Sequence, residues 1–316
     1  YQMLLSLGFL LLIVSFIGIF KSTSTRYANI QKWVNRVVVG MMAVVFVYLA
    51  VGLGMRWAIS GHAPWSNGYE AVVFIAWVTM IAGFSFMRKN IVILAGTAIL
   101  ASLMIFVTEL SLFDPEITPL VPVLKSYWLK IHVAIITGSY GFLGLAAILG
   151  FLNLVLYIVR NDKNKAIVTI NINELTYVSE MTMTIGLFML TIGTFLGGIW
   201  ANESWGRYWG WDPKETWALV SVLVYAVILH LRFIPKLSGK FLFNVVSFWG
   251  YSSILFTFFG VNFMLVGLHS YANGDGIGKF PTWLSLTILF FVMFTLIAYF
   301  RNRSIERKSK QDLLSE

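Results

Sequence analysis

Apolar stretches of about 20 residues, separated by short polar segments, form the dominant pattern of this chain. A stretch of this length crosses the hydrocarbon core of a bilayer as a helix, and the longest one, residues 127–159, is expected to tilt or protrude. The pattern predicts an all-α polytopic membrane protein with about nine transmembrane helices. The predicted spans are residues 3–20, 37–59, 70–87, 91–109, 127–159, 177–200, 216–233, 242–265 and 283–300.

The amino-acid composition agrees with a membrane protein. Of the 316 residues, 58% are hydrophobic and 12% are charged, whereas soluble domains average about 45–50% apolar and about 25% charged residues. So little charge argues against a soluble enzyme, a disordered chain and a nucleic-acid-binding protein, despite the net charge of +9. Because the chain has no cysteine, disulfides, thiolate metal sites and cysteine nucleophiles are excluded.

The basic residues lie mostly on one side of the predicted spans. Seventeen of the 23 Lys and Arg residues follow the first, third, fifth, seventh and ninth spans, and such residues accumulate on the cytoplasmic side. This bias predicts a cytoplasmic C-terminus and an outward N-terminus. The chain begins YQMLLSLGFLL, without the basic region of a signal peptide. Two interpretations stay open, a shortened chain or a longer polypeptide that precedes residue 1 on the outer side.

Four loops are expected on the outer side, at residues 60–70, 110–126, 201–217 and 267–283. The third, ANESWGRYWGWDPKETW, concentrates aromatic residues between two spans. An aromatic belt at the membrane surface is the plainer interpretation. Glycines that admit a flat ligand and indoles that stack on it favour a site for a planar hydrophobic ligand. The residues concerned are Trp205, Gly206, Tyr208, Trp209, Gly210, Trp211 and Trp217.

The four histidines fall into two groups. His62, His132 and His269 are predicted on the outer side, whereas His230 lies 14 residues into the seventh span, about 21 Å deep at 1.5 Å per residue. A lone intramembrane histidine is either a hydrogen-bonded packing residue or a functional one. Haem iron takes two axial ligands, commonly histidine, within apolar and aromatic walls. The pattern therefore offers one outer site with up to three candidate ligands and one inner site with a single candidate.

A family resemblance rests on these residues. WGRYWGWDPKETW at 205–217 resembles the WWD signature of haem-handling membrane proteins, in the form found in the CcsA (ResC) branch of system II cytochrome c biogenesis. SGHAPWSNGYE at 60–70 and the settings of His132 (WLKIHV) and His269 (GLHSY) are also similar to that branch. The resemblance extends from about residue 35 to about residue 300.

The resemblance implies transport of haem b (iron protoporphyrin IX) across a bacterial inner membrane. On the periplasmic side, a cytochrome c synthetase activity, that of a haem lyase, would join the haem vinyls by thioether bonds to the CxxCH motif of apocytochrome c. By position, His132 and His269 resemble the outer iron ligands and His230 resembles an inner one. The second inner ligand would then come from a CcsB (ResB) partner, and thioredoxin-like proteins would reduce the client thiols. His62 matches no family ligand.

The resemblance also implies a domain division. We expect residues 1–35 to be the last helix of a preceding CcsB-like part with a cytoplasmic linker, as in a fused CcsB–CcsA protein. Residues 36–316 would then form the CcsA-like domain, embedded in lipid.

Charged residues of the third outer loop each have two interpretations. Asp212 either caps the helix that begins at Pro213 or contacts the ligand. Arg207, Lys214 and Arg56 either pair with haem propionates or are solvated basic residues near the interface.

Three alternative functions stay open at this point. A haem exporter or chaperone without ligation activity would use the same histidines. A haem-binding or quinone-binding respiratory subunit usually places histidine pairs inside the membrane, whereas three of these four are expected outside. A structural scaffold leaves the tryptophan-rich loop unexplained.

Overall fold

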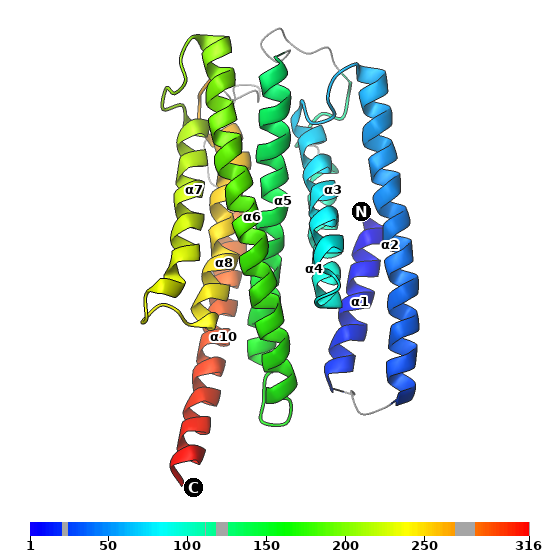
Figure 1. The fold of residues 1–316 in the computed structure, drawn as a ribbon, viewed down its shortest axis with the longest axis vertical. Coiled ribbons are helices and arrows are strands. Elements are labelled where there is room, and N and C mark those ends of the chain that lie inside the picture. Colours follow the sequence, from blue (N-terminus) through cyan, green and yellow to red (C-terminus); the bar gives the residue numbers. More distant parts are fainter. Residues whose placement is uncertain (21–24, 111, 118–125, 269–281, 316) are drawn as a thin grey trace.

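A computed structural model describes residues 1–20, 25–110, 112–117, 126–268 and 282–315, and every regular element in them is helical (Figure 1). Among the described residues, eight helices are long and apolar enough to cross a membrane, whereas α1, the first of the nine predicted spans, is a shorter apolar helix. This confirms the predicted all-α polytopic fold. The elements are α1 Gln2–Phe20, α2 Thr25–Ser60, α3 Gly68–Phe86, α4 Ile91–Thr108, α5 Tyr127–Val159, α6 Lys165–Trp205, α7 Pro213–His230, η2 Leu231–Phe233, α8 Lys240–Leu255, the π-helical turn η3 Phe256–Gly260, α9 Val261–Met264 and α10 Thr282–Ser315.

Three helices extend well past the predicted spans. α2 and α6 begin at Thr25 and Lys165, before the apolar stretches that start at residues 37 and 177, and α10 continues to Ser315. The extensions contain Lys, Arg, Glu and Gln, which are too polar for a hydropathy pattern but favourable in a helix. The hydrophobic pattern therefore located the membrane crossings and missed helical turns beyond them.

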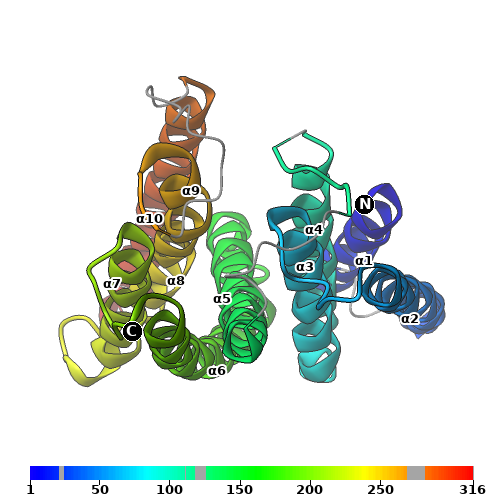
Figure 2. The same ribbon diagram turned by 90° about the horizontal axis from the view of Figure 1, so that it is seen from above.

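Helix α5 lies between two groups of helices (Figure 2). One group contains α1 to α4, and the other contains α6 to α10. Buried apolar side chains of α5 join both groups, because Leu145 and Leu149 pack with residues of α3, α4 and α6, and Tyr140 and Leu143 pack with residues of α3, α6, α7 and α8. The position of α5 therefore fixes the relative placement of the two groups.

The described parts of the four predicted outer loops lie at one end of the bundle, which we call the tryptophan end (the upper end in Figure 1). Hydrogen bonds connect them where the structure describes them. Arg56 Nη2 donates to the Glu116 carbonyl over 3.2 Å, and Ser126 donates to Glu203. The Leu268 backbone N–H donates to Asp212 Oδ1 over 2.6 Å. We call the opposite end, where the α5–α6 and α7–α8 connections lie, the basic end.

A buried polar cluster holds α5, α6 and α8 together toward the basic end. Asn153 Nδ2 donates to Asn244 Oδ1 over 2.6 Å and to Thr176 Oγ1 over 3.1 Å, and Asn244 Nδ2 donates to Thr176 Oγ1 over 2.8 Å. Interhelical hydrogen bonds of this kind contribute about 0.6 kcal/mol each in membrane bundles. The helices approach closely enough because Gly150 has no side chain: a Cβ there would lie 2.7 Å from the Asn244 carbonyl oxygen.

The expected domain division after residue 35 falls inside α2. Leu4, Leu7 and Leu11 of α1 are buried against α2, α3 and α4. The division stays a prediction, because descent of residues 1–35 from a separate protein would leave no mark on this packing.

We predict that Gly150→Ala lowers the thermal stability of the protein, because its Cβ would meet a backbone atom of α8 that cannot rotate away. Overpacking of this kind costs about 1–3 kcal/mol. The measurement is the unfolding midpoint in detergent. Gly40→Ala is the matched control, since a Cβ at Gly40 has no atom within 4 Å. Equal midpoints for both variants would contradict the close contact between α5 and α8.

Candidate functional site

His132 lies one turn into α5 at the tryptophan end, half-buried against α6. Its Nδ1 is 2.7 Å from the Gly193 carbonyl oxygen. Because a carbonyl only accepts hydrogen bonds, Nδ1 carries the proton and Nε2 carries the lone pair. Metal-binding histidines are commonly oriented in this way by a hydrogen bond from the other ring nitrogen.

Two glycines of α6 make room for α5, Gly197 for the His132 ring and Gly193 for Ile136 one turn further along. A Cβ at Gly197 would lie 2.6 Å from His132 Cε1, and a Cβ at Gly193 would lie 3.0 Å from Ile136 Cβ. Trp200 continues the same helix, is 1% exposed and lies parallel to the imidazole at a ring-centroid distance of 6.4 Å. Sequence reasoning missed these three residues. The Gly-x-x-x-Gly spacing inside a span, a signature of close helix packing, was the available signal.

The tryptophan-rich loop connects α6 to α7 by two local devices. Gly206 ends α6 in the left-handed conformation, with φ of 71°. Asp212 caps α7 in a capping box with Glu215, and Pro213 follows at the first helical position. The expected capping role of Asp212 is therefore confirmed, and contact with a ligand stays a prediction. Gly210 lies under the Arg207 side chain, because a Cβ there would overlap the guanidinium.

The aromatic residues of the loop form two layers. In the inner layer, which is half-buried, Trp205 contacts the buried Trp200 at a ring-centroid distance of 4.8 Å, and Trp217 contacts Phe256 at 4.1 Å. In the exposed layer, Trp211 is 69% exposed and has a φ of 57°, a left-handed conformation that costs about 1–2 kcal/mol. Such strain is commonly retained at binding sites. Tyr208 (64% exposed) belongs to this layer, and the half-buried Trp209 lies beneath it in edge contact with Trp211.

The loop lies against the helix that contacts His132. A Cβ at Gly198 would lie 3.1 Å from the Tyr208 carbonyl oxygen, so the loop backbone folds back onto the last turns of α6. Gly198 follows Gly197, which touches the His132 ring. Together with the contact of Trp205 on Trp200, this brings the predicted ligand His132 and the predicted aromatic wall into one site.

The three cations that the sequence offered for propionates differ in their partners. Arg56 forms an ion pair of 2.7 Å with the buried Glu70, and Arg207 forms one of 3.1 Å with Glu215. Lys214 Nζ instead donates to the amide oxygen of Asn262 over 2.8 Å. Two of the three positive charges are therefore already neutralised by a carboxylate.

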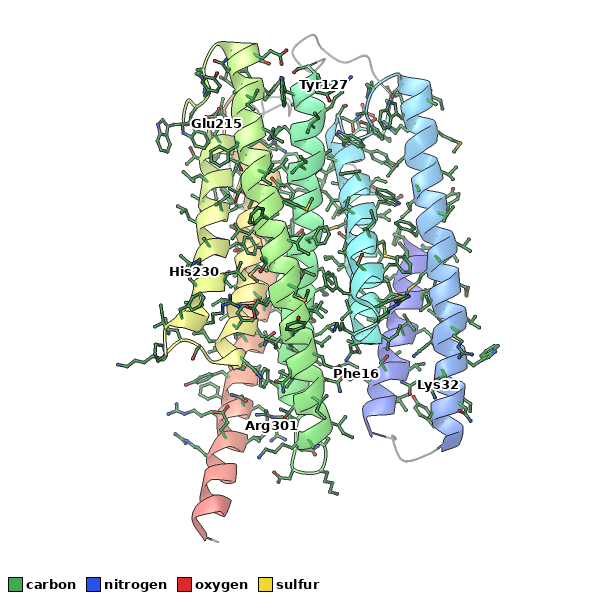
Figure 3. All side chains as sticks on the ribbon, in the orientation of Figure 1. Phe16, Lys32, Tyr127, Glu215, His230 and Arg301 are labelled. Carbon is green, nitrogen blue, oxygen red and sulfur yellow. The ribbon has the colours of Figure 1, made fainter. Side chains whose placement is uncertain are left out.

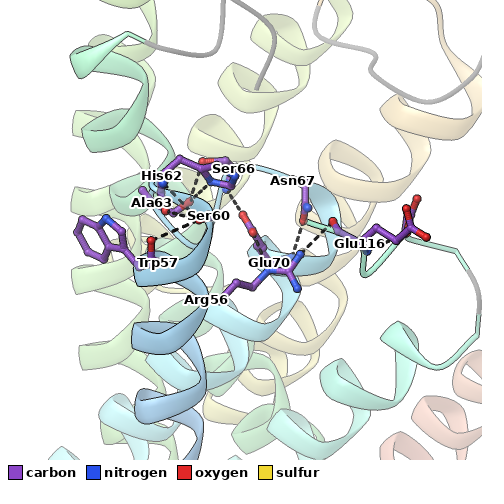
Figure 4. Close-up of polar contacts among 10 residues, drawn as sticks. Arg56, Trp57, Ser60, His62, Ala63, Ser66, Asn67, Glu70 and Glu116 are labelled. Atoms are coloured by element: carbon purple, nitrogen blue, oxygen red, sulfur yellow. Dashed lines mark hydrogen bonds and ion pairs between the residues drawn. The ribbon is translucent and has the colours of Figure 1, made fainter. Parts of the chain in front are cut away.

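His62 lies in the adjoining loop between α2 and α3 and is buried (Figure 4). Its Nδ1 is 3.3 Å from the Ala63 carbonyl, and within the part of the chain that the structure describes, its Nε2 has no hydrogen-bond partner. Trp65 of the same loop donates from Nε1 to the Lys130 carbonyl of α5 over 3.0 Å. This loop therefore braces α5 two residues before His132.

His230 is remote from these residues, at the last position of α7 (Figure 3). Its ring is exposed, and Nδ1 is 2.7 Å from the Ala226 carbonyl oxygen, so Nε2 carries the lone pair. Leu223 and Val227 on the same outward face are 56% and 61% exposed. His269 lies outside the described residues. The residue before it, Leu268, is bound to Asp212 as described above.

Comparison with known proteins shows which family and which relatives this chain resembles. The family model of the Cytochrome C assembly protein matches residues 65–269. NrfI of Wolinella succinogenes is 50% identical over 232 residues, which cover 73% of this chain and 26% of NrfI, so the chain matches about a quarter of that relative. CcsA of Guillardia theta is 34% identical over 255 residues, which cover 73% of this chain and 84% of that relative. CcsA of Prochlorococcus marinus is 35% identical over 269 residues, which cover 75% of this chain and 84% of that relative.

The matched region contains the tryptophan-rich loop and three of the four histidines, His132, His230 and His269, whereas His62 lies just before it. The family model spans more than half of the chain, and the CcsA relatives are aligned over most of their own length. This chain therefore belongs to the cytochrome c assembly protein family and is similar to the CcsA members of that family.

Proposed function

We propose that this protein carries haem b across the membrane and attaches it covalently to apocytochrome c at the tryptophan end. The observation that carries the proposal is the oriented imidazole of His132, whose Nδ1 is held by the Gly193 carbonyl beside the tryptophan-rich loop. An Nε2 lone pair is what an axial iron ligand supplies, and aromatic walls accommodate the macrocycle. Haem is therefore a substrate in this proposal.

The chain's own residues perform three tasks at the outer site. His132 and His269 ligate the iron, and the inner layer of Trp205 and Trp217 keeps water from one side of the macrocycle. Tyr208 and Trp211 are exposed where a client approaches, and the half-buried Trp209 supports Trp211. Gly206, Gly210, Asp212 and Arg207 shape the loop that holds these aromatic rings.

The attachment step adds a client thiol to a haem vinyl group. A carbon–sulfur bond forms at the vinyl carbon next to the ring, and the thiol proton is transferred to the terminal carbon, so no electrons are exchanged with a third partner. Holding thiol and vinyl in contact removes several kcal/mol of the barrier. The absence of cysteine from this chain avoids competition with the client thiols.

His230 fits an inner site that is completed by another protein. Its exposed ring faces away from the bundle, beside the exposed apolar side chains of Leu223 and Val227. A second ligand would therefore come from a neighbouring membrane helix, and a CcsB-like partner is the proposed source. In this assignment the tryptophan end faces the periplasm and the basic end faces the cytoplasm of a bacterium.

We expect His132→Ala and Gly197→Ala to reduce haem bound at the outer site by about 10–100-fold, the usual cost of disturbing a ligand or its orientation. In Gly197→Ala the new Cβ displaces the imidazole. The measurements are the visible spectrum of the purified protein and covalent haem on a co-expressed CxxCH reporter. Gly52→Ala is the control, because a Cβ there meets no atom within 4 Å.

Wild-type haem content and ligation in both variants would reject His132 as the ligand. Normal haem binding without covalent haem on the reporter, in the wild type with its partner present, would instead favour a haem exporter over a synthetase.

For His230→Ala, we predict that haem made inside the cell no longer reaches the outer site, while haem supplied from outside still binds there. The physical reason is that the inner iron loses its ligand and the outer residues are unchanged. Val227→Ala, on the same exposed face, is the matched control. Undiminished delivery of internal haem in His230→Ala would refute an inner site at this residue.

A further inference from the structure

Lys214 differs from the other basic residues around the tryptophan-rich loop. Arg56 and Arg207 are each paired with a carboxylate. In the part of the chain that the structure describes, no carboxylate oxygen lies within ion-pair distance of Lys214 Nζ, whose one hydrogen bond runs to the neutral amide of Asn262. Its positive charge is therefore the one of the three that is not compensated by an ion pair.

The Lys214 side chain lies on the inward face of α7. Ala218, Ser221 and Tyr225 follow it at helical spacing, and all three are buried. Lys214 itself is half-buried. A cation in such a place costs free energy unless an anion or several hydrogen bonds compensate it, because water reaches it only in part.

The amide of Asn262, which accepts the hydrogen bond from Lys214, is itself held in place by a second hydrogen bond. Asn262 Nδ2 donates to the Phe258 carbonyl oxygen over 2.6 Å, which turns Oδ1 toward the ammonium. The π-helical turn η3 directly precedes α9 and carries Phe256, which packs on Trp217. π-Helical turns occur frequently at functional sites. The ammonium is thus fixed beside the inner aromatic layer, with two of its three N–H groups available to a ligand.

The nearest acid, Asp212, is occupied by the backbone. Its Oδ2 accepts from the Lys214 N–H over 3.2 Å, and its Oδ1 accepts from the Leu268 N–H. These bonds cap α7 and hold the segment before residue 269. The Asp212 carboxylate attracts the Lys214 ammonium through space, but within the described residues the cap gives Nζ no direct ion pair, because both oxygens accept from backbone N–H groups.

We propose that Lys214 binds a propionate carboxylate of the porphyrin, which supplies the missing negative charge. This inference rests on the proposed haem site and adds to it the orientation of the substrate. The propionates of protoporphyrin IX lie at one edge of the ring and the vinyls on the pyrroles away from that edge. A propionate held at Lys214 turns the vinyl groups away from α9, which is what a reaction with an external thiol requires.

The experiment compares haem with haem dimethyl ester, whose carboxylates are blocked, by absorbance titration of the purified full chain. We expect the wild type to bind haem at least about tenfold more tightly than the ester, the range of one charge-assisted hydrogen bond. Lys214→Met should bind both ligands alike, at the affinity of the ester. Lys214→Arg should retain the preference for haem.

Two further variants serve as comparisons. Lys163→Met removes a positive charge from the exposed α5–α6 connection and should behave as the wild type. Arg207→Met tests the alternative propionate ligand, and loss of the preference in that variant with retention in Lys214→Met would overturn the proposal. If Lys214→Met fails to fold, Lys214→Gln replaces it, because glutamine can still donate to Asn262.

The remaining outcomes distinguish failure of the role of Lys214 from failure of the haem site itself. Equal affinity of the wild type for haem and its ester, or an equal loss of both in Lys214→Met, would overturn the role of Lys214 and leave the haem site intact. A wild type that binds neither porphyrin would remove the proposed function and this inference with it.

Discussion

The close approach of α5 and α6 at the tryptophan end is the contact on which the site depends. Two glycines one helical turn apart on α6 leave space that any larger side chain would fill; the His132 ring lies against Gly197, and Ile136 lies against Gly193. The same approach exposes the Gly193 carbonyl to Nδ1, which selects one tautomer. Backbone packing thus decides both the position of the imidazole and which nitrogen carries its lone pair.

The tryptophan-rich loop is fixed at both ends, and this explains how it sustains strain in the middle. Gly206 ends α6 in a left-handed turn, and the Asp212 cap, worth about 1 kcal/mol, begins α7. Trp211 stands just before the cap with a positive φ and a largely exposed indole. An exposed, strained aromatic ring between two rigid ends is arranged for contact with another molecule and contributes little to the bundle.

The membrane crossings could be predicted from the sequence because a helix that crosses a bilayer must be apolar over about 20 residues. The tryptophan-rich loop could be predicted because so many tryptophans in one short segment are rare. Sequence reasoning could not sort the three cations, since Glu70 and Glu215 become partners of Arg56 and Arg207 only once α2, α3, α6 and α7 are placed. It also missed Trp200, which resembles any interfacial aromatic residue until α5 packs beside it. Composition and periodicity report the environment of single helices, whereas a site is made by pairs of helices.

Helix α7 separates the two proposed sites and gives them an order. It begins at the Asp212 cap and ends at His230, and its 18 residues span about 27 Å at 1.5 Å per residue. That distance is far beyond the reach of one iron atom, so a haem bound at His230 must leave it before His132 becomes its ligand. The exposed setting of His230 suits such a release, because a ligand pair formed between two proteins separates when they move apart. His132 is half-buried between α5 and α6, and its hydrogen bond crosses to the neighbouring helix, which suits retention while a client binds. The exposed surroundings of His230 therefore match a site of haem entry, and the half-buried surroundings of His132 match a site of reaction.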